Sequence, residues 1–165
     1  MTRTPITREG YARLREELER LKKKDRVQII KEIQAARAHG DISENAEYHA
    51  AREKQGWIEA KIRDLETKLA ESEIVDPPRG PQERVRFGVR VRLEDLETGE
   101  EKTYEIVGPH ESDFSKGRIS ITSPLARAML GKEVGEEVVV QAPGRTREYE
   151  ILEIEGLSPL SDERS

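Results

Sequence analysis

Three acidic residues, Asp41, Glu44 and Glu47, follow Gly40, and no lysine or arginine occurs between residues 38 and 51. Carboxylate oxygens are the ligands that Mg²⁺ prefers in proteins. The ion demands a nearly complete octahedral set of oxygens, however, so a few carboxylates alone do not hold it tightly. If these residues bind a metal, they therefore complete a site that a partner supplies.

The same residues have a simpler explanation as helix caps. A sequence Asp-x-x-Glu ahead of a helix is close to a capping box, and acidic side chains in a first helical turn interact favourably with the helix dipole. Asp41 or Ser43 would then accept hydrogen bonds from the free amides that open the following helix. The spacing alone leaves both roles open and favours capping.

Two long helical patterns stand on either side of this acidic run. Apolar residues recur in both at steps of three and four, the spacing of a coiled-coil seam. Thr7 is a plausible N-cap and Gly40 a typical helix terminator, so we expect residues 8–39 and 46–75 to form an antiparallel helical hairpin. Trp57 is expected to pack at its seam. The seam residues are Leu14, Leu18 and Leu21 in the first arm and Ile58, Ile62, Leu65 and Leu69 in the second.

The seam of the first arm shifts partway along. Asp25 and Gln28 occupy positions where apolar residues would continue it, and apolar residues resume at Val27, Ile30 and Ile33. A break of this kind in the apolar period predicts a local change in helical winding.

Other side chains near the turn could serve it. Arg37 and Arg52 flank it from opposite arms, although a single exposed arginine on a coiled coil is most often only solvated surface. Ser43, Asn45 and Tyr48 are expected to support the turn. A long narrow hairpin with carboxylates at its end suggests a device that delivers them to another molecule.

The second half of the chain has a different pattern. Prolines end the helical region and indicate a stiff linker over residues 77–81. Beyond it, short alternating runs predict a small antiparallel sheet, and Ser123 with Pro124 predicts the start of one helix over residues 125–130. The expected strands are residues 85–87, 89–93, 102–107, 118–121, 138–140 and 148–154.

The predicted fold class is therefore α+β, with two domains of different character. We expect a coiled-coil finger over residues 1–76, a linker over 77–81, a sheet domain over 82–158 and a flexible tail over 159–165. Basic and acidic residues balance in the first 76 residues, sixteen of each, whereas the remainder carries 13 basic and 18 acidic residues. This acidity argues against the sheet domain gripping nucleic acid by charge.

The composition excludes several classes of protein. The chain has 165 residues, of which 38% are charged and none is cysteine, so disulfides and thiolate metal sites are ruled out. No signal peptide or membrane span is recognisable, and we expect a cytoplasmic protein. The sheet half contains no Ser/His/Asp grouping and no glycine-rich phosphate loop, so we do not expect an enzyme acting by itself.

Two motifs resemble the signatures of one bacterial family, the Gre transcript cleavage factors. The first runs from Ala36 to Glu53 and reads ARAHGDISENAEYHAARE, and the second runs from Ile119 to Lys132 and reads ISITSPLARAMLGK. The likeness covers about residues 4–157, in the family's order.

The resemblance implies a specific function. In that family the coiled coil enters the secondary channel of RNA polymerase, while an FKBP-like C-terminal domain rests on the channel rim. Asp41 and Glu44 would match the family's two acids, which help hold the second catalytic Mg²⁺ so that the polymerase hydrolyses the 3′ end of backtracked RNA. The free protein would not bind that Mg²⁺ tightly.

The resemblance also implies roles away from the acids. Arg37 and Arg52 would meet the extruded RNA. Ser123 and Pro124 would lie near the contact with the channel rim.

Three rival functions deserve comparison. A prolyl isomerase would need an aromatic-lined pocket, and residues 77–165 offer only Phe87, Tyr104, Phe114 and Tyr149. An inhibitor that binds the polymerase channel would share the architecture but alter the acidic turn. A coiled-coil adaptor without catalytic role would leave that turn unexplained.

Overall fold

The computed structural model describes residues 3–40 and 45–158, and these fall into two compact units. The hairpin unit comprises residues 11–72, and the sheet unit comprises residues 1–10 and 73–165. Residues 159–165, predicted to be a flexible tail, lie outside the described residues. No helix in the described ranges is long and apolar enough to cross a membrane.

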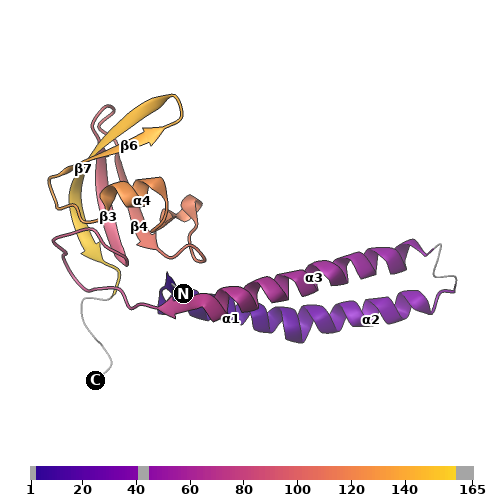
Figure 1. Cartoon of the computed structure of the whole chain (residues 1–165). Coiled ribbons are helices and arrows are strands. Elements are labelled where there is room, and N and C mark those ends of the chain that lie inside the picture. The colour runs from indigo at the N-terminus through magenta and orange to yellow at the C-terminus, as the bar shows by residue number, and fades with distance from the viewer. Residues whose placement is uncertain (1–2, 41–44, 159–165) are drawn as a thin grey trace, which may run out of the picture. The chain divides into compact units, whose positions relative to one another are not determined.

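The hairpin unit consists of helices, as the spacing of apolar residues predicts. Its elements are α1 (Arg8–Arg20), the π-helical turn η1 (Leu21–Asp25), α2 (Arg26–Arg37) and α3 (Ala46–Glu71). Helix α3 runs back beside α2 (Figure 1). The core between the arms consists of Leu21, Ile29, Ile33, Ala51, Ile58, Ile62 and Leu65.

The predicted change in winding is the π-helical turn η1. A π turn adds one residue, so the seam steps eight residues from Leu21 to Ile29, one more than a heptad. Ile29 and Ile33 are buried, whereas Val27 and Ile30 are 44% and 41% exposed. The prediction that Val27 and Ile30 continue the seam is therefore wrong, because the inserted residue rotates a neighbouring face into the core.

The sheet unit is built on five strands in the order β5-β4-β3-β7-β6 (Figure 1). Three of the four pairings are antiparallel, but β5 pairs with β4 in parallel, so the sheet is mixed rather than wholly antiparallel as predicted. The chain crosses between β4 and β5 through the 3₁₀ turn η3 (Phe114–Lys116) instead of a tight hairpin. The strands are β3 (Val89–Asp95), β4 (Glu101–Val107), β5 (Arg118–Ser120), β6 (Glu137–Ala142) and β7 (Arg145–Gly156).

One short helix, α4 (Pro124–Met129), completes this unit, and its Met129 and Ala126 are fully buried with the sheet. The apolar core is Val85, Val89, Val91, Leu93, Tyr104, Ile106, Ile119, Ala126, Met129, Val138, Tyr149, Ile151 and Ile154. Val85 belongs to this core without forming a strand, so the strand predicted over residues 85–87 is absent.

Two further strands, β1 (Thr4–Ile6) and β2 (Ser72–Ile74), form a separate small sheet that the sequence does not predict. Thr7 acts as the predicted N-cap of α1, because its Oγ1 accepts a hydrogen bond from Gly10 N at 3.0 Å. Glu111 in turn accepts from Thr7 N at 2.8 Å. These contacts join the N-terminal residues to the sheet unit.

Residues 77–81, predicted as a linker, also lie within the sheet unit. Gly156 N donates to Gly80 O at 2.8 Å, and Ser158 N donates to Pro78 O at 3.1 Å. This segment therefore runs along the end of β7 and is held there by backbone hydrogen bonds.

Candidate functional site at the hairpin turn

The predicted catalytic and metal-binding residues, Asp41 and Glu44, lie outside the described residues, as does Ser43. The site is therefore built from the residues on both sides of them. The preceding side is the end of α2, and the following side is the first turn of α3.

Helix α2 ends at Arg37, two residues before the predicted position. His39 N donates to Ala36 O at 3.1 Å, which tightens the last turn. Gly40 then has a φ of 110°, a backbone conformation that side chains with a β-carbon rarely adopt. Gly40 is thus placed where the sequence predicts the helix to stop.

Asn45 joins the two arms at this end of the hairpin. Its Oδ1 accepts from Tyr48 N at 3.1 Å, which makes Asn45 the N-cap of α3. Its Nδ2 donates to Ala36 O at 2.5 Å, a carbonyl at the end of α2 that the helix leaves without a partner. One side chain therefore satisfies a free amide of one helix and a free carbonyl of the other.

This assignment corrects the prediction that Asp41 or Ser43 caps the second helix. Asn caps a helix about as well as Asp or Ser, and it stands directly before Ala46, the first residue of α3. The Asp41–Glu44 pair is therefore not the capping box of α3. Its acids remain available for another purpose.

Tyr48 and Arg52 form a second fixed pair next to the turn. Arg52 Nη1 donates to the Tyr48 hydroxyl at 3.0 Å, and the guanidinium carbon lies 5.9 Å from the ring centroid. Tyr48 itself packs against the hairpin core. Arg37 is exposed at the end of α2, and among the described residues its side chain has no hydrogen bond or ion pair.

The electrostatics of the described part of the turn are weak. His39 Nδ1 lies 3.9 Å from Glu47 Oε2, and both side chains are mostly exposed. Over residues 3–40 and 45–158, no group of three His, Asp or Glu side chains could hold a metal ion. The donor chemistry of Asp41 and Glu44 fits Mg²⁺, but two carboxylates supply only part of the ion's oxygen ligands.

The arms behind the turn are joined by an ion pair that the sequence does not reveal. Arg26 Nε and Nη2 donate to the two carboxylate oxygens of Glu59, each at 2.7 Å. Hydrogen bonding to Arg26 lowers the pKa of Glu59 below its ordinary value. Because α2 and α3 meet only once the register is known, no local pattern could have paired these residues.

The predicted polymerase-docking residues lie at the start of α4. Ser123 Oγ accepts from Ala126 N at 3.3 Å as its N-cap, and Pro124 is the first helical residue and is exposed. The predicted helix start is therefore confirmed.

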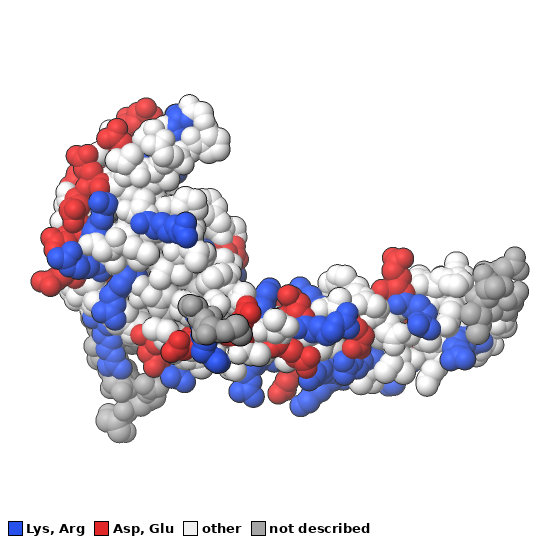
Figure 2. Space-filling view, viewed as in Figure 1, with Lys and Arg blue, Asp and Glu red and all other residues white. Residues whose placement is uncertain are grey.

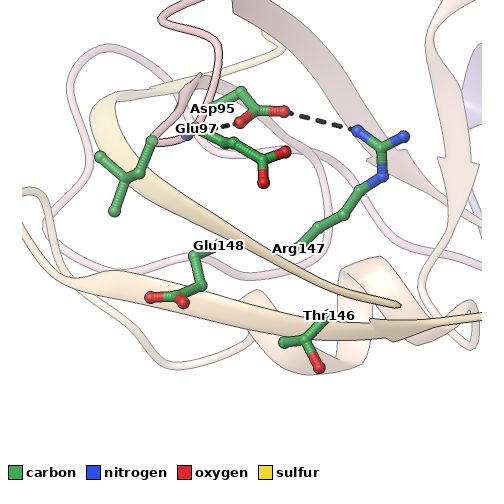
Figure 3. Close-up of a pocket in the computed structure, with 6 residues that line it drawn as sticks. Asp95, Glu97, Thr146, Arg147 and Glu148 are labelled. Atoms are coloured by element: carbon green, nitrogen blue, oxygen red, sulfur yellow. Dashed lines mark hydrogen bonds and ion pairs between the residues drawn. The ribbon is translucent and has the colours of Figure 1, made fainter. Parts of the chain in front are cut away.

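A buried carboxylate in the sheet unit, Asp95, was not singled out by the sequence. Its Oδ1 accepts from Glu97 N at 2.8 Å and from Thr98 N at 3.2 Å, and its Oδ2 lies 3.4 Å from Arg147 Nη1 (Figure 3). The Glu97 amide foremost, with the Thr98 amide and Arg147, lowers the pKa of Asp95. These partners hold the turn between β3 and β4, which is a structural role.

Comparisons with known proteins identify the family. Residues 4–74 match a model described as "Transcription elongation factor, N-terminal", and residues 80–156 match "Transcription elongation factor, GreA/GreB, C-term". The chain is 55% identical to transcription elongation factor GreA of Thermodesulfovibrio yellowstonii over 152 residues, covering 92% of this chain and 96% of that protein. It is 52% identical to the factor of the same name from Caulobacter vibrioides over 157 residues, covering 95% and 100%.

Among solved structures, the chain is similar to GreA factor homolog 1 of Thermus thermophilus, with 30% identity, coverage of 93% and 99%, and a TM-score of 0.43. Two family models spanning most of the chain and the level of identity to the curated relatives confirm the resemblance seen in the two motifs. The chain belongs to the GreA/GreB family of transcription elongation factors.

Proposed function

We propose that this protein acts with RNA polymerase and stimulates the polymerase to hydrolyse the 3′ end of backtracked RNA. The hairpin enters the secondary channel and presents Asp41 and Glu44 to the catalytic centre. Family membership supports this function. The observation that carries it is the Asn45 cap of α3, because it relieves the two acids of the capping role.

The dimensions of the hairpin suit delivery of side chains to a buried site. Helix α3 contains 26 residues, which corresponds to about 39 Å at the α-helical rise. The buried residues nearest the turn are Ala36 and Ala51, whereas isoleucines and a leucine fill the part farther from it. Small residues allow the two helices to approach closely, so the end that enters the channel is narrow.

The proposed roles of the other side chains follow from where they lie. Arg37 and Arg52 stand at the ends of the two arms and would bind the phosphates of the extruded RNA. Asn45 and Tyr48 hold those arm ends together. Ser123 and Pro124 would contact the rim of the channel.

In this proposal the polymerase and the pair Asp41 and Glu44 would share one Mg²⁺. When bound, that ion supplies positive charge at the scissile phosphate and lowers the pKa of a water molecule. The chain by itself would have no nuclease activity, because two carboxylates do not assemble a two-metal centre. Such a factor would act in the bacterial cytoplasm with the transcription machinery.

The test uses a purified, stalled and backtracked elongation complex, read for shortened RNA. Asp41→Asn with Glu44→Gln removes both charges while it keeps side-chain size, and Asn45 remains to cap α3. We expect this variant to fold, to compete with the unmodified protein for the polymerase, and to lose most of the stimulation. Raised Mg²⁺ should recover part of the lost rate.

Glu47→Gln is the matched control, because Glu47 is an exposed acid in the first turn of the same helix. It should stimulate cleavage nearly as well as the unmodified protein. Full stimulation by the Asp41/Glu44 variant at low Mg²⁺, or reproducible cleavage of free RNA without polymerase, would overturn the proposal.

A further inference from the structure

The single tryptophan of the chain lies on the surface of the hairpin. Trp57 is 60% exposed on α3, although the apolar pattern predicts it at the seam, so that prediction is wrong. The neighbouring Ile58 takes the seam position and is 1% exposed. A large aromatic side chain left in water gains none of the free energy that its burial would supply.

Lysines flank Trp57 along the helix. Lys61 Nζ lies 5.7 Å from the ring centroid of Trp57, and its nearest carboxylate oxygen, on Glu17, is 3.9 Å away. Lys54, one turn before Trp57, has no ion pair among the described residues. The exposed aromatic ring thus carries a positive charge on each side.

A shallow apolar groove continues this surface toward the turn. Its walls come from α2 and α3, and Lys54 is one of its lining residues. Ala50, Lys54, Trp57 and Lys61 follow one another at steps of four, three and four residues, so they share one face of α3. The alanines in the groove are Ala35, Ala36, Ala50 and Ala51.

A glycine beside the tryptophan is also unexplained by the free chain. Gly56 lies in the interior of α3, where glycine is less favourable than alanine. A β-carbon added at Gly56 would meet nothing within 4 Å, so no packing inside the described chain requires its absence. A missing side chain beside a projecting one offers a partner both a hollow and an anchor.

We propose that Ala50, Lys54, Trp57 and Lys61, here called the Trp57 face, form a docking surface for an acidic protein surface of RNA polymerase. That surface offers an apolar pocket for Trp57 and carboxylates for the two lysines. The inference rests on the proposed function, which brings this arm of the hairpin against the polymerase. Tryptophan is the residue type most enriched among the few that dominate protein interfaces.

The charges favour a protein over a nucleic acid as the occupant. Affinity for phosphates requires several cations acting together, and it grows with their number. The Trp57 face offers two lysines, while Glu53 and Asp64 are exposed within two turns of Trp57 on the same helix. A few cations around an aromatic anchor instead suit a pocket with an acidic rim.

The test measures competition with labelled unmodified protein for the stalled elongation complex. We expect Trp57→Ala to weaken binding on the order of thirtyfold, as for an interface hot spot, and Trp57→Phe to restore most of it. Lys54→Glu with Lys61→Glu should weaken binding on the order of tenfold, mainly through slower association. Val27→Ala, an exposed apolar residue of α2 outside the Trp57 face, should bind like the unmodified protein.

A second measurement does not depend on mutagenesis of the face. Replacing the single tryptophan by 5-hydroxytryptophan gives a fluorophore that can be excited apart from the tryptophans of the polymerase. Its quenching by acrylamide should fall on binding. A fluorophore that stays equally accessible in the complex would overturn the docking surface.

The outcomes also separate this inference from the proposed function. If Trp57→Ala binds normally while the unmodified protein stimulates cleavage, the docking surface is wrong and the function stands. An equal loss with Val27→Ala, or a loss of self-association or of free-RNA binding in its place, would also overturn it. An unmodified protein that neither binds polymerase nor stimulates cleavage would overturn both.

Discussion

The hairpin unit and the sheet unit remove apolar side chains from water in different ways. In the sheet unit, six core side chains have 0% exposure, namely Val89, Val91, Leu93, Ile106, Val138 and Ile151. The hairpin core is a single line of side chains with exposures between 1% and 9%. It is supplemented by ion pairs between the arms, such as Lys22 with Glu66 at 2.9 Å. The difference indicates that the sheet is built for stability, whereas the hairpin is built for reach and keeps its surface polar, with charges of both signs interleaved (Figure 2).

The largest expected effect compares equal truncations in the two cores. Ile151→Ala removes a side chain enclosed on all sides by the sheet core and should lower the free energy of unfolding of that unit by about 4 kcal/mol. Ile58→Ala in the hairpin should cost about 2–3 kcal/mol, because solvent and the partner helix can relax into the space. Val139→Ala, at a position 50% exposed on β6, is the control and should change little.

Urea unfolding can assign each loss to its unit. Trp57 emission reports the hairpin, and the near-ultraviolet circular dichroism of the buried Tyr104 and Tyr149 reports the sheet. Two probes are needed because units that unfold separately do not share one transition. Equal losses for Ile151→Ala and Ile58→Ala would contradict the contrast between the cores.

A smaller effect is expected at the thin end of the hairpin, where a polar side chain takes over from apolar packing. Asn45→Ala removes the cap of α3 and the hydrogen bond to Ala36 O, and should cost about 1–2 kcal/mol of hairpin stability. Asn45→Asp keeps the cap but cannot donate to Ala36 O, so it should retain part of that stability. Trp57 emission during urea unfolding measures both, and indistinguishable variants would show that the bond between the arms contributes nothing.

Much of the hairpin could be predicted from the sequence, because helical periodicity depends only on neighbours along the chain. The winding change was predictable at Asp25 and Gln28, but the face that it buries was not. A single inserted residue decides between Ile29 and Ile30, and only packing against α3 shows where it is inserted. Trp57 was misplaced for the same reason, since the adjacent Ile58 fits the seam equally well by spacing.

The sheet unit was less predictable, since its pairings join distant residues. The strands β1 and β2 have three residues each, too few for an alternating pattern, and the parallel pairing of β5 depends on the path of the crossover. At the turn, Asp41, Ser43 and Asn45 are all good caps by residue type, and the start of α3 at Ala46 selects Asn45. Asp95 carried a usable signal, because an Asp before a Thr-Gly turn commonly bonds the backbone ahead of it.

An effect confined to acid separates the sheet from the hairpin again. The pKa of Asp95 lies below its ordinary value of 3.8, first because of the Glu97 amide. A carboxyl whose pKa is lowered on folding contributes stability that is present above the unfolded pKa and lost as the pH falls through the folded pKa. Asp95→Asn keeps an oxygen for the amides of Glu97 and Thr98 but loses the charge beside Arg147. Its sheet unit should therefore lose less stability than the unmodified protein between about pH 4 and pH 2, by tyrosine circular dichroism in urea. Parallel losses in the two proteins would contradict this assignment.

The smallest change in stability is expected where the proposed function predicts a large change in activity. Arg37→Ala with Arg52→Ala removes two exposed cations, and among the described residues these lose only the hydrogen bond from Arg52 to the Tyr48 hydroxyl. Exposed interactions of this kind are worth about 0–1 kcal/mol, so the urea midpoint read by Trp57 emission should barely move. Crosslinking of the RNA 3′ end to the hairpin in a backtracked complex should nevertheless fall, because the two cations that would face its phosphates are gone. Arg26→Ala is the matched control, since Arg26 is bound to Glu59 through two hydrogen bonds farther from the turn. It should lower hairpin stability more than the double variant and leave the crosslink intact. The opposite pattern, a stable Arg26→Ala variant with weakened crosslinking beside an unaffected double variant, would mean that Arg37 and Arg52 are solvated surface and that the RNA meets another part of the hairpin.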